Sequence, residues 1–225
     1  MIHVLIALVI AVASLAGPAR AQGADSWYAI TAEDGSPVAN HRVPVELESQ
    51  IETLPGIVVV GNPRGDVTIV EFYDLNCPYC RKAAADIAEL VKADKELRLV
   101  LVPLPVLGIP SIAASRVELA VAALAAPRFY DFHRRIYAGR GVVDANRALA
   151  VARELGLPAD RVIAAANADG VTEAMKSHVR LADAMGLAAT PSFVIKGVAI
   201  VGHPGRAALA GIIRAIRSCD KVVCG

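Results

Sequence analysis

Apolar and polar positions along the chain follow strand-like and helix-like periods in a regular order. Residues 67–73 (VTIVEFY) are almost continuously apolar, which is typical of a buried central strand, and residues 97–104 (LRLVLVPL) have the same character. Between them, apolar residues recur at helical spacing over residues 80–94. The pattern predicts a β–α–β unit with two parallel strands and a right-handed crossover.

A block with helical periodicity comes next, over residues 111–187. Strand patterns return at 191–197 (PSFVIKG) and 198–203 (VAIVGH), spaced as a hairpin, and a helical pattern over 205–218 closes the series. The pieces on either side of the helical block need each other to complete one sheet. The sequence therefore predicts an α/β domain that a helical block interrupts.

In the segment 22–62 the apolar and polar residues do not follow the regular α/β pattern that begins near residue 66. Its first part predicts two short extended runs around a turn at Asp34, and residues 44–56 predict a short helix. One face of that helix carries Leu47, Ile51 and Leu54. We expect an N-terminal extension and a candidate segment for homo-oligomerisation.

The first residues resemble a leader. An apolar run from Val4 to Ala16 is followed by Ala19, Arg20 and Ala21, a small-x-small cleavage pattern. This predicts a secretory signal over residues 1–21, cleaved after Ala21, and a periplasmic protein. The alternative is an uncleaved anchor helix, for which the apolar core is short.

The net charge over the chain is +1, and removing the leader takes away one basic residue. A balanced surface argues against nucleic acid as a partner. All four cysteines lie beyond the leader, and an even number in an oxidising compartment predicts paired cysteines.

The stretch NCPYC places Cys77 and Cys80 three residues apart, between the first predicted strand and its helix. Pro78 suits the first turn of a helix, and the two cysteines then share one helical face. Unpaired N–H groups at the helix start stabilise a thiolate, and such thiols have pKa values of ~3.5 to ~7. We expect Cys77 to be the exposed, ionised nucleophile and Cys80 to resolve the mixed disulfide.

Other uses of this pair remain open on the spacing alone. A structural disulfide across so small a loop would constrain the unfolded chain little. A four-cysteine zinc site needs a second pair of suitable spacing, which Cys219 and Cys224 do not provide. A copper site of two thiolates is the alternative that spacing does not exclude.

The order of a strand, CPYC, a helix, a helical block and TPSFVIKG resembles the DsbA-like branch of the thioredoxin superfamily. Within it, GNPRGDVTIVEFYDLNCPYCRKAA followed by LVPLPVLGIPSIAASRVELA is similar to exported disulfide oxidoreductases of the ScsC/Com1 kind. The resemblance implies a thioredoxin fold with a mixed central sheet and an inserted all-helical subdomain. The implied division is a thioredoxin-fold domain over 63–110 and 188–218, a helical insertion over 111–187 and a tail over 219–225.

The resemblance also implies roles for single residues. Cys77 and Cys80 match the redox pair, and Pro78 and Tyr79 between them are expected to contact the substrate. Thr190 and Pro191 match a loop whose proline is cis and faces the cysteines, so that backbone at residue 190 can pair with an extended substrate. Glu71, six residues before Cys77, matches a buried carboxyl that relays a proton to or from Cys80. Its alternative is a solvent-facing acid at a strand end.

Tyr79 departs from the histidine that strong oxidases of this branch carry between their cysteines. A histidine stabilises a thiolate through charge, whereas a neutral phenol does not. We therefore expect a couple less oxidising than DsbA, nearer ~−200 mV than ~−120 mV.

Cys219 and Cys224 close a short loop at the end of the sequence, which predicts a structural disulfide. A second redox pair that exchanges electrons with Cys77 and Cys80 is the alternative. The spacing of four histidines predicts surface or helix-face positions rather than metal ligands; these are His41, His133, His178 and His203. We expect no metal and no cofactor.

The resemblance and the cysteine chemistry together predict an exported enzyme that forms or isomerises disulfides in other proteins. Isomerase capability is slightly favoured over a pure oxidase, because Thr190 stands before the cis-proline in place of a valine. Its expected partners are unfolded or mis-oxidised secreted proteins and a membrane redox partner. The alternative is a periplasmic copper-binding protein that uses the same two thiolates.

Overall fold

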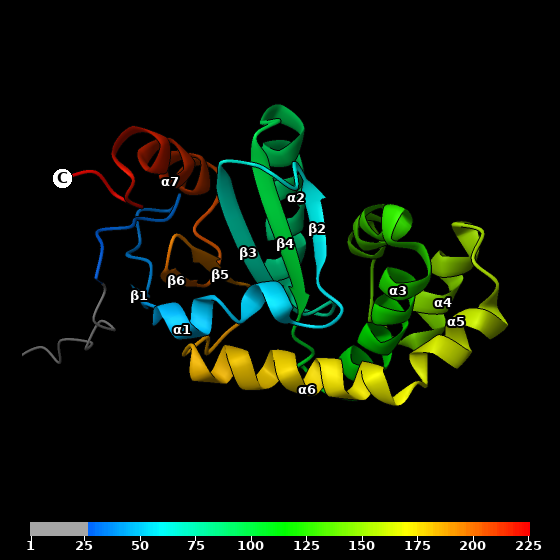
Figure 1. The fold of residues 1–225 in the computed structure, drawn as a ribbon. Coiled ribbons are helices and arrows are strands. Elements are labelled where there is room, and N and C mark those ends of the chain that lie inside the picture. The colour runs from blue at the N-terminus through cyan, green and yellow to red at the C-terminus, as the bar shows by residue number, and fades with distance from the viewer. Residues whose placement is uncertain (1–26) are drawn as a thin grey trace, which may run out of the picture.

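A computed structural model describes residues 27–225; the predicted leader and its cleavage site lie outside the described residues. The centre is a six-stranded mixed sheet in the order β1–β6–β5–β3–β4–β2 (Figure 1). Its strands are β1 (Asn40–Arg42), β2 (Val58–Gly61), β3 (Val67–Tyr73), β4 (Leu97–Pro103), β5 (Ser192–Ile195) and β6 (Val198–Val201). The predicted fold class is confirmed.

The predicted β–α–β unit consists of β3, α2 (Pro78–Ala93) and β4. Strands β3 and β4 are parallel and pair from Val67 opposite Leu97 to Tyr73 opposite Pro103. Strand β5 pairs with β3 on its other side, antiparallel, with Phe193 opposite Glu71. Residues on both sides of the helical block therefore complete one sheet.

The sheet is covered on both faces, as its apolar central strands require. On one face, α2, the inserted helices and α7 (Arg206–Cys219) pack over Ile69, Tyr73 and Leu99. On the other face, the end of α6 (Asp169–Ala184) packs over Phe72. Successive side chains of a strand point to opposite faces, so Glu71 lies on the same face as Tyr73, towards α2.

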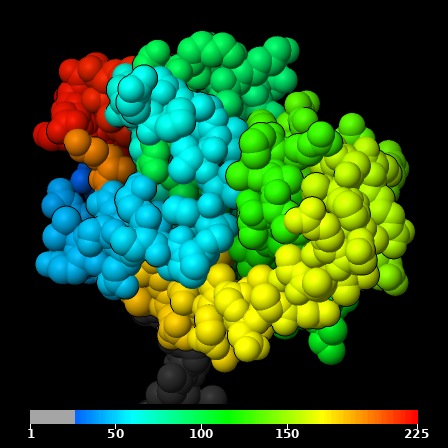
Figure 2. Space-filling view, turned by 45° about the vertical axis from the view of Figure 1, so that its right-hand side comes forward, coloured from blue at the N-terminus to red at the C-terminus, as the bar shows by residue number. Residues whose placement is uncertain are grey.

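The inserted helices form a lobe beside the sheet, and α6 runs along one side of both parts (Figures 1 and 2). They are α3 (Ile109–Ala138), α4 (Ala145–Glu154), α5 (Ala159–Ala166) and α6. Helix α3 is kinked at Ala125, two residues before Pro127, because a proline inside a helix removes one N–H and clashes with the preceding turn. By length and composition alone α3 could cross a membrane, a property that buried core helices share.

The segment before β3 forms both edges of the sheet. Strand β1 pairs with β6 and β2 pairs with β4, both antiparallel. Between them, the predicted helix is divided into α1 (Val45–Glu48) and a 3-10 turn, η1 (Ile51–Thr53). Ile51 is buried against the sheet, and Leu47 and Leu54 pack beside it. The apolar face on which the oligomerisation prediction rests is therefore used within the chain.

Candidate active site

Cys77 is the residue that begins helix α2. It is the N-cap, with extended backbone (φ −77°, ψ 121°), and Pro78 occupies the first turn. The Cys80 N–H donates a hydrogen bond to the Cys77 sulfur at 3.3 Å. The sulfur takes the place of the side-chain oxygen that usually caps a helix. It faces backbone N–H groups of the first turn, which have no carbonyl partner within the helix.

The loop before β5 closes over the same sulfur. The Thr190–Pro191 peptide bond is cis, and the Cys77 thiol donates to the Thr190 carbonyl at 3.1 Å. The structure thus brings the four residues of the predicted redox site together: Cys77, Cys80, Thr190 and Pro191. Their roles stay predictions.

The surroundings of Cys77 favour its thiolate. Hydrogen bonding with the side chain of Cys80, with the side chain of Thr190 and with the backbone of Cys80 and Tyr79 together lowers the pKa of Cys77 to about 6, against the opposing effect of burial. The thiol is less accessible than the sequence suggested, since only 4% of Cys77 is exposed. The helix start and the proline loop enclose it from two sides.

The surroundings of Cys80, unlike those of Cys77, disfavour its thiolate. Cys80 lies one turn into α2, is fully buried and is reduced, as is Cys77. Burial raises the pKa of the Cys80 thiol strongly, and its hydrogen bond with Cys77 and the charge on Glu71 raise it further. If a disulfide between Cys77 and Cys80 opens, the Cys80 sulfur therefore needs a proton.

Glu71 is the buried acid that the family resemblance implies as the proton relay for Cys80. It is 1% exposed, and its Oε2 has no hydrogen-bond partner within residues 27–225. Burial raises the pKa of Glu71 to about 8, with further contributions from the charges of Cys77 and Glu118. It lies at an interior position and holds its proton at neutral pH, rather than facing solvent at a strand end.

Asp74 organises the backbone around the cysteines, and sequence reasoning missed it. Its Oδ2 accepts from the N–H groups of Val106 and Leu107, both at 2.9 Å. Its Oδ1 accepts from the Ser111 hydroxyl at 2.7 Å and from the Asn76 N–H at 2.8 Å. One buried carboxylate thereby joins the loop before Cys77 to the loop before α3 and to the first turn of α3.

Asn76 makes a second connection to the insertion. Its side-chain amide donates to the Val143 carbonyl at 2.9 Å and accepts from the Val143 N–H at 2.7 Å. Arg81, next to Cys80, donates to the carbonyls of Tyr137 and Gly139 at the end of α3. The helical lobe is therefore attached to the redox helix by specific polar contacts.

Apolar side chains project from the segments that these contacts hold. Tyr79 is 69% exposed, and large parts of Val106, Leu107, Ile109 and Val142 are exposed as well. They come from three segments around the site: the first turn of α2, the β4–α3 connection and the α3–α4 connection. Such a rim suits contact with apolar side chains of another protein.

Cys219 and Cys224 form a disulfide with a Cα–Cα distance of 6.0 Å. Cys219 is the last residue of α7, so this pair lies at the end of a helix, whereas Cys77 and Cys80 lie at the start of one.

Two of the four histidines are not surface residues. His133 in α3 and His178 in α6 are buried on helix faces, one of the two kinds of position that the sequence predicted. Each ring nitrogen of His178 lies within 2.8 Å of a backbone carbonyl, those of Pro103 and Pro55. Helical periodicity places both on inward faces, but the polar partners come from distant segments.

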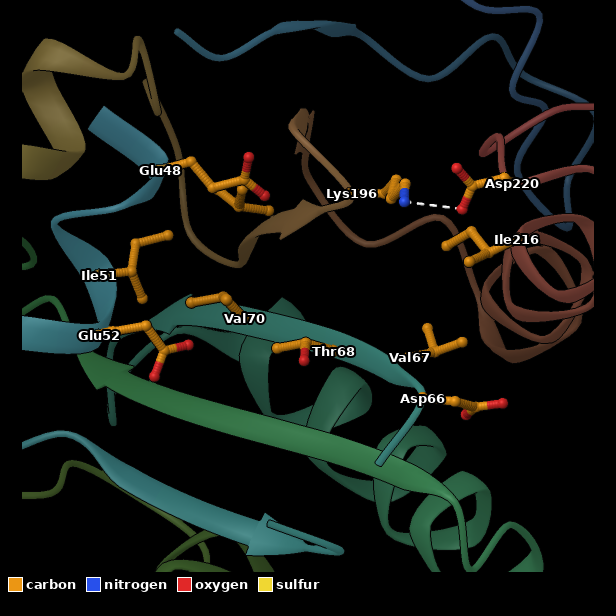
Figure 3. A pocket seen from close by; sticks show the side chains of 11 residues that line it. Glu48, Ile51, Glu52, Asp66, Val67, Thr68, Val70, Lys196, Ile216 and Asp220 are labelled. Atoms are coloured by element: carbon orange, nitrogen blue, oxygen red, sulfur yellow. Dashed lines mark ion pairs between the residues drawn. The ribbon is translucent and has the colours of Figure 1, made fainter. Parts of the chain in front are cut away.

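A separate hollow of about 280 Å³ lies at the opposite end of the sheet (Figure 3). Asp66, which lines it, precedes β3, whereas the cysteines come after that strand. Lys196 and Asp220 form an ion pair of 2.7 Å at its rim. Neither Cys77 nor Cys80 contributes to this hollow.

Comparison with known proteins agrees with this geometry. A protein-family model described as Thioredoxin matches residues 53–215. The crystal structure of a thioredoxin-like oxidoreductase from Silicibacter pomeroyi DSS-3 is similar, with a TM-score of 0.71 and 34% sequence identity. That match covers 76% of this chain and 98% of the other.

Two further matches are more distant. The thiol-disulfide exchange protein alpha-DsbA2 from Wolbachia pipientis is 23% identical, with a TM-score of 0.69, over 76% of this chain and 94% of that chain. A curated Na(+)/H(+) antiporter NhaA from Herminiimonas arsenicoxydans is 27% identical over 177 residues, 78% of this chain and 28% of that protein. The chain thus spans less than a third of the length of the curated relatives it matches.

Proposed function

The chain belongs to the thioredoxin family, and from that premise we propose that it is an exported thiol–disulfide oxidoreductase whose working groups are Cys77 and Cys80. One observation carries the proposal: a sulfur with a pKa of about 6 stands at the start of a helix, three residues before a fully buried thiol. This asymmetry is what directional disulfide exchange requires.

The two environments determine the course of the exchange. In the oxidised enzyme, a substrate thiolate attacks the Cys77 sulfur, the Cys77–Cys80 bond breaks, and its electron pair leaves on Cys80. Burial makes a Cys80 thiolate costly, so Cys80 takes a proton, for which we propose Glu71 as the donor.

A mixed disulfide between substrate and Cys77 results. A second substrate thiolate then attacks the substrate sulfur, and Cys77 leaves as a thiolate that the helix start stabilises. The substrate has gained a disulfide and the enzyme a dithiol, which a membrane redox partner reoxidises. Unfolded or mis-oxidised secreted proteins are the proposed substrates, with the apolar rim around Tyr79 as their contact surface.

The first experiment is equilibration of the purified protein with reduced and oxidised glutathione, with Cys77→Ser as the control. We expect reversible formation of one disulfide in the wild-type protein beyond the Cys219–Cys224 bond, and none in the variant. A wild-type protein that forms no additional disulfide at any glutathione ratio contradicts the proposal.

We extend the proposal to isomerase capability on the basis of Thr190, the residue before the cis-proline. Isomerases of this class usually present two or more sites to a shared cleft, which requires a homo-oligomer. The segment 22–62 is the proposed contact, through side chains other than Leu47, Ile51 and Leu54, which pack within the chain. Refolding of scrambled ribonuclease and light scattering test it together. A monomer that leaves scrambled ribonuclease unrepaired is a pure oxidase or reductase instead.

Copper binding by the same two sulfurs is the competing function. It needs both sulfurs as thiolates, and burial, by raising the pKa of Cys80, opposes this. Titration of the reduced protein with Cu(I) against a competing chelator separates the two. Tight binding without disulfide turnover would favour copper.

A further inference from the structure

A groove of about 380 Å³, the α3–α6 groove, lies between helix α6 and the start of α3, and the proposed exchange does not use it. Met175, a buried residue of α6, lines it together with Val179 of α6 and Ile112 of α3, whose large apolar side chains are exposed. Pro105, in the connection between β4 and α3, completes its apolar lining. A groove of this volume, mainly apolar with a few polar groups, is typical of sites that bind apolar groups of a ligand.

The α3–α6 groove adjoins the apolar rim beside the cysteines. The first and last residues of the segment 105–112 line the groove, whereas Val106, Leu107 and Ile109 between them are exposed in the rim. Asp74 attaches this segment to the loop before the cysteines through two of its backbone N–H groups. An extended chain that lies across the rim therefore meets the groove as its next contact.

Hydrogen bonds fix the walls of the groove. The ring nitrogens of His178 lie within 2.8 Å of the carbonyls of Pro103 and Pro55, which attaches α6 to the end of β4 and to the turn before β2. Arg116 of α3 donates to the Thr172 hydroxyl of α6 at 2.8 Å. The groove is therefore formed before anything binds, and binding requires little ordering of the protein.

The edge of the groove on α6 carries positive charge, from Lys176 and Arg180, both exposed. Lys176 pairs with Glu173 at 2.9 Å, and so exposed a pair contributes little free energy. Arg180 donates to the Ser177 hydroxyl at 3.0 Å, and no carboxylate within residues 27–225 forms an ion pair with it. A carboxylate of an incoming chain therefore meets two cations of which at most one is weakly paired.

We propose that the α3–α6 groove binds the substrate protein at a second place: it takes a large apolar side chain of an extended substrate segment, and Lys176 and Arg180 bind carboxylates next to that side chain. The inference rests on the proposed function, since the bound protein is the one whose thiols react at Cys77. A second contact on the same chain raises the affinity for that chain. Glutathione has no large apolar side chain and gains nothing from it.

The probes are reduced peptides in which two cysteines are joined by a glycine-serine linker to one of three tags: Leu-Leu-Glu-Glu, Leu-Leu-Lys-Lys or Ser-Ser-Glu-Glu. Each tag is placed on either side of the cysteines, with linkers of graded length. Oxidation of each peptide by the oxidised enzyme at low ionic strength gives a half-saturating concentration and a limiting rate. For the best Leu-Leu-Glu-Glu peptide we expect a half-saturating concentration about tenfold below that of Ser-Ser-Glu-Glu and about fivefold below that of Leu-Leu-Lys-Lys, with equal limiting rates.

Lys176→Glu combined with Arg180→Glu reverses the charge at the edge of the groove. This double variant should prefer Leu-Leu-Lys-Lys to Leu-Leu-Glu-Glu, a reversal that loss of folding cannot produce. Val179→Asp puts a carboxylate into the apolar lining and should raise the half-saturating concentration of Leu-Leu-Glu-Glu about tenfold. Lys92→Glu combined with Lys95→Glu, at the end of α2 away from the cysteines, changes the net charge equally and should keep the wild-type preference.

Equal half-saturating concentrations for the three peptides in the wild-type protein overturn the inference, and so does a double variant at Lys176 and Arg180 that still prefers Leu-Leu-Glu-Glu. Light scattering tests whether a second copy of the chain occupies the groove instead. A wild-type dimer that Val179→Asp dissociates would assign the groove to self-association and would also overturn the inference.

Glutathione keeps the two proposals apart. A wild-type protein that does not exchange with glutathione refutes the proposed function, while fluorescence anisotropy of a labelled Leu-Leu-Glu-Glu peptide without cysteines still reports on the groove. Normal exchange with glutathione together with equal half-saturating concentrations for the three peptides refutes only the groove.

Discussion

The two cysteine pairs lie at opposite kinds of helix end, and the difference explains their different states. At the start of α2, an N–H group points at the Cys77 sulfur. At the end of α7, the sulfurs meet carbonyl oxygens instead, since Cys224 Sγ lies 3.7 Å from the carbonyl of Ala215. The positive end of one helix stabilises a thiolate, and the negative end of the other disfavours one. The same side chain therefore suits exchange at one place and a lasting disulfide at the other.

The largest expected effect is on the rate of disulfide exchange, and it distinguishes the two cysteine pairs. Cys77→Ser should abolish oxidation of a reduced peptide dithiol, because no nucleophilic sulfur remains at the helix start. Cys219→Ser combined with Cys224→Ser should leave the rate within about twofold, since within the described residues the hydrogen bonds of the distal pair are with Ala215, Ser218 and Lys221, none of which belongs to the site. Equal loss in both proteins would make the distal pair a redox relay, the alternative that the sequence left open.

A pH series sharpens the comparison next. The pKa of Cys77 is about 6 in the folded reduced protein, below its value in the unfolded chain. The stability that this thiolate adds is lost as the pH falls through 6. Between pH 6 and pH 8, reduced protein should gain about 2 kcal/mol over oxidised protein in free energy of unfolding, before unfolded thiols ionise near pH ~8.5. Denaturant unfolding of both forms measures it, with Cys77→Ser as the control that lacks this gain.

Removal of the distal disulfide should act on stability alone. The Cys219→Ser, Cys224→Ser protein loses a constraint on its unfolded chain worth about 2 kcal/mol for so short a loop. Urea unfolding of oxidised wild type and the double variant gives the difference. An unchanged midpoint would mean that the last turn of α7 frays regardless of the bond.

The smallest effect concerns Tyr79. Replacing it with histidine puts a partial positive charge in the first turn of α2, which favours the Cys77 thiolate and thus the reduced protein. The glutathione equilibrium should shift about tenfold towards reduction, roughly 30 mV. Tyr79→Asn, neutral and of similar polarity, is the control. If the histidine and asparagine variants have the same redox potential, the charge at residue 79 does not help to set it.

Local patterns in the sequence predicted most of the fold. The apolar run of β3, the helical spacing after Cys80 and the hairpin of β5 and β6 all match the structure. The family resemblance is confirmed by the match over residues 53–215. In each case the signal lies within a few neighbouring residues.

The features that the sequence did not predict depend on contacts between distant residues. Asp74 binds Ser111, 37 positions away, and Tyr73 binds Glu118, 45 positions away. The spacing of apolar residues does not identify a carboxyl that accepts four hydrogen bonds, as that of Asp74 does, or one that lies beneath the helix of the cysteines. The edge strands β1 and β2 were also unassigned to the sheet, because short strands carry little pattern before their partners are known.

Those edges have a consequence for the proposed function, in which unfolded chains are the substrates. An open sheet margin recruits any extended polypeptide and can seed aggregation. Here the margins are strands of three and four residues, and the backbone at Trp27 and the Asn40 side chain cover the outer side of β1. Within the proposed function, extended substrates bind at the apolar rim around Tyr79 and at the proline loop beside Cys77, and the short edges of the sheet do not hold them after the reaction.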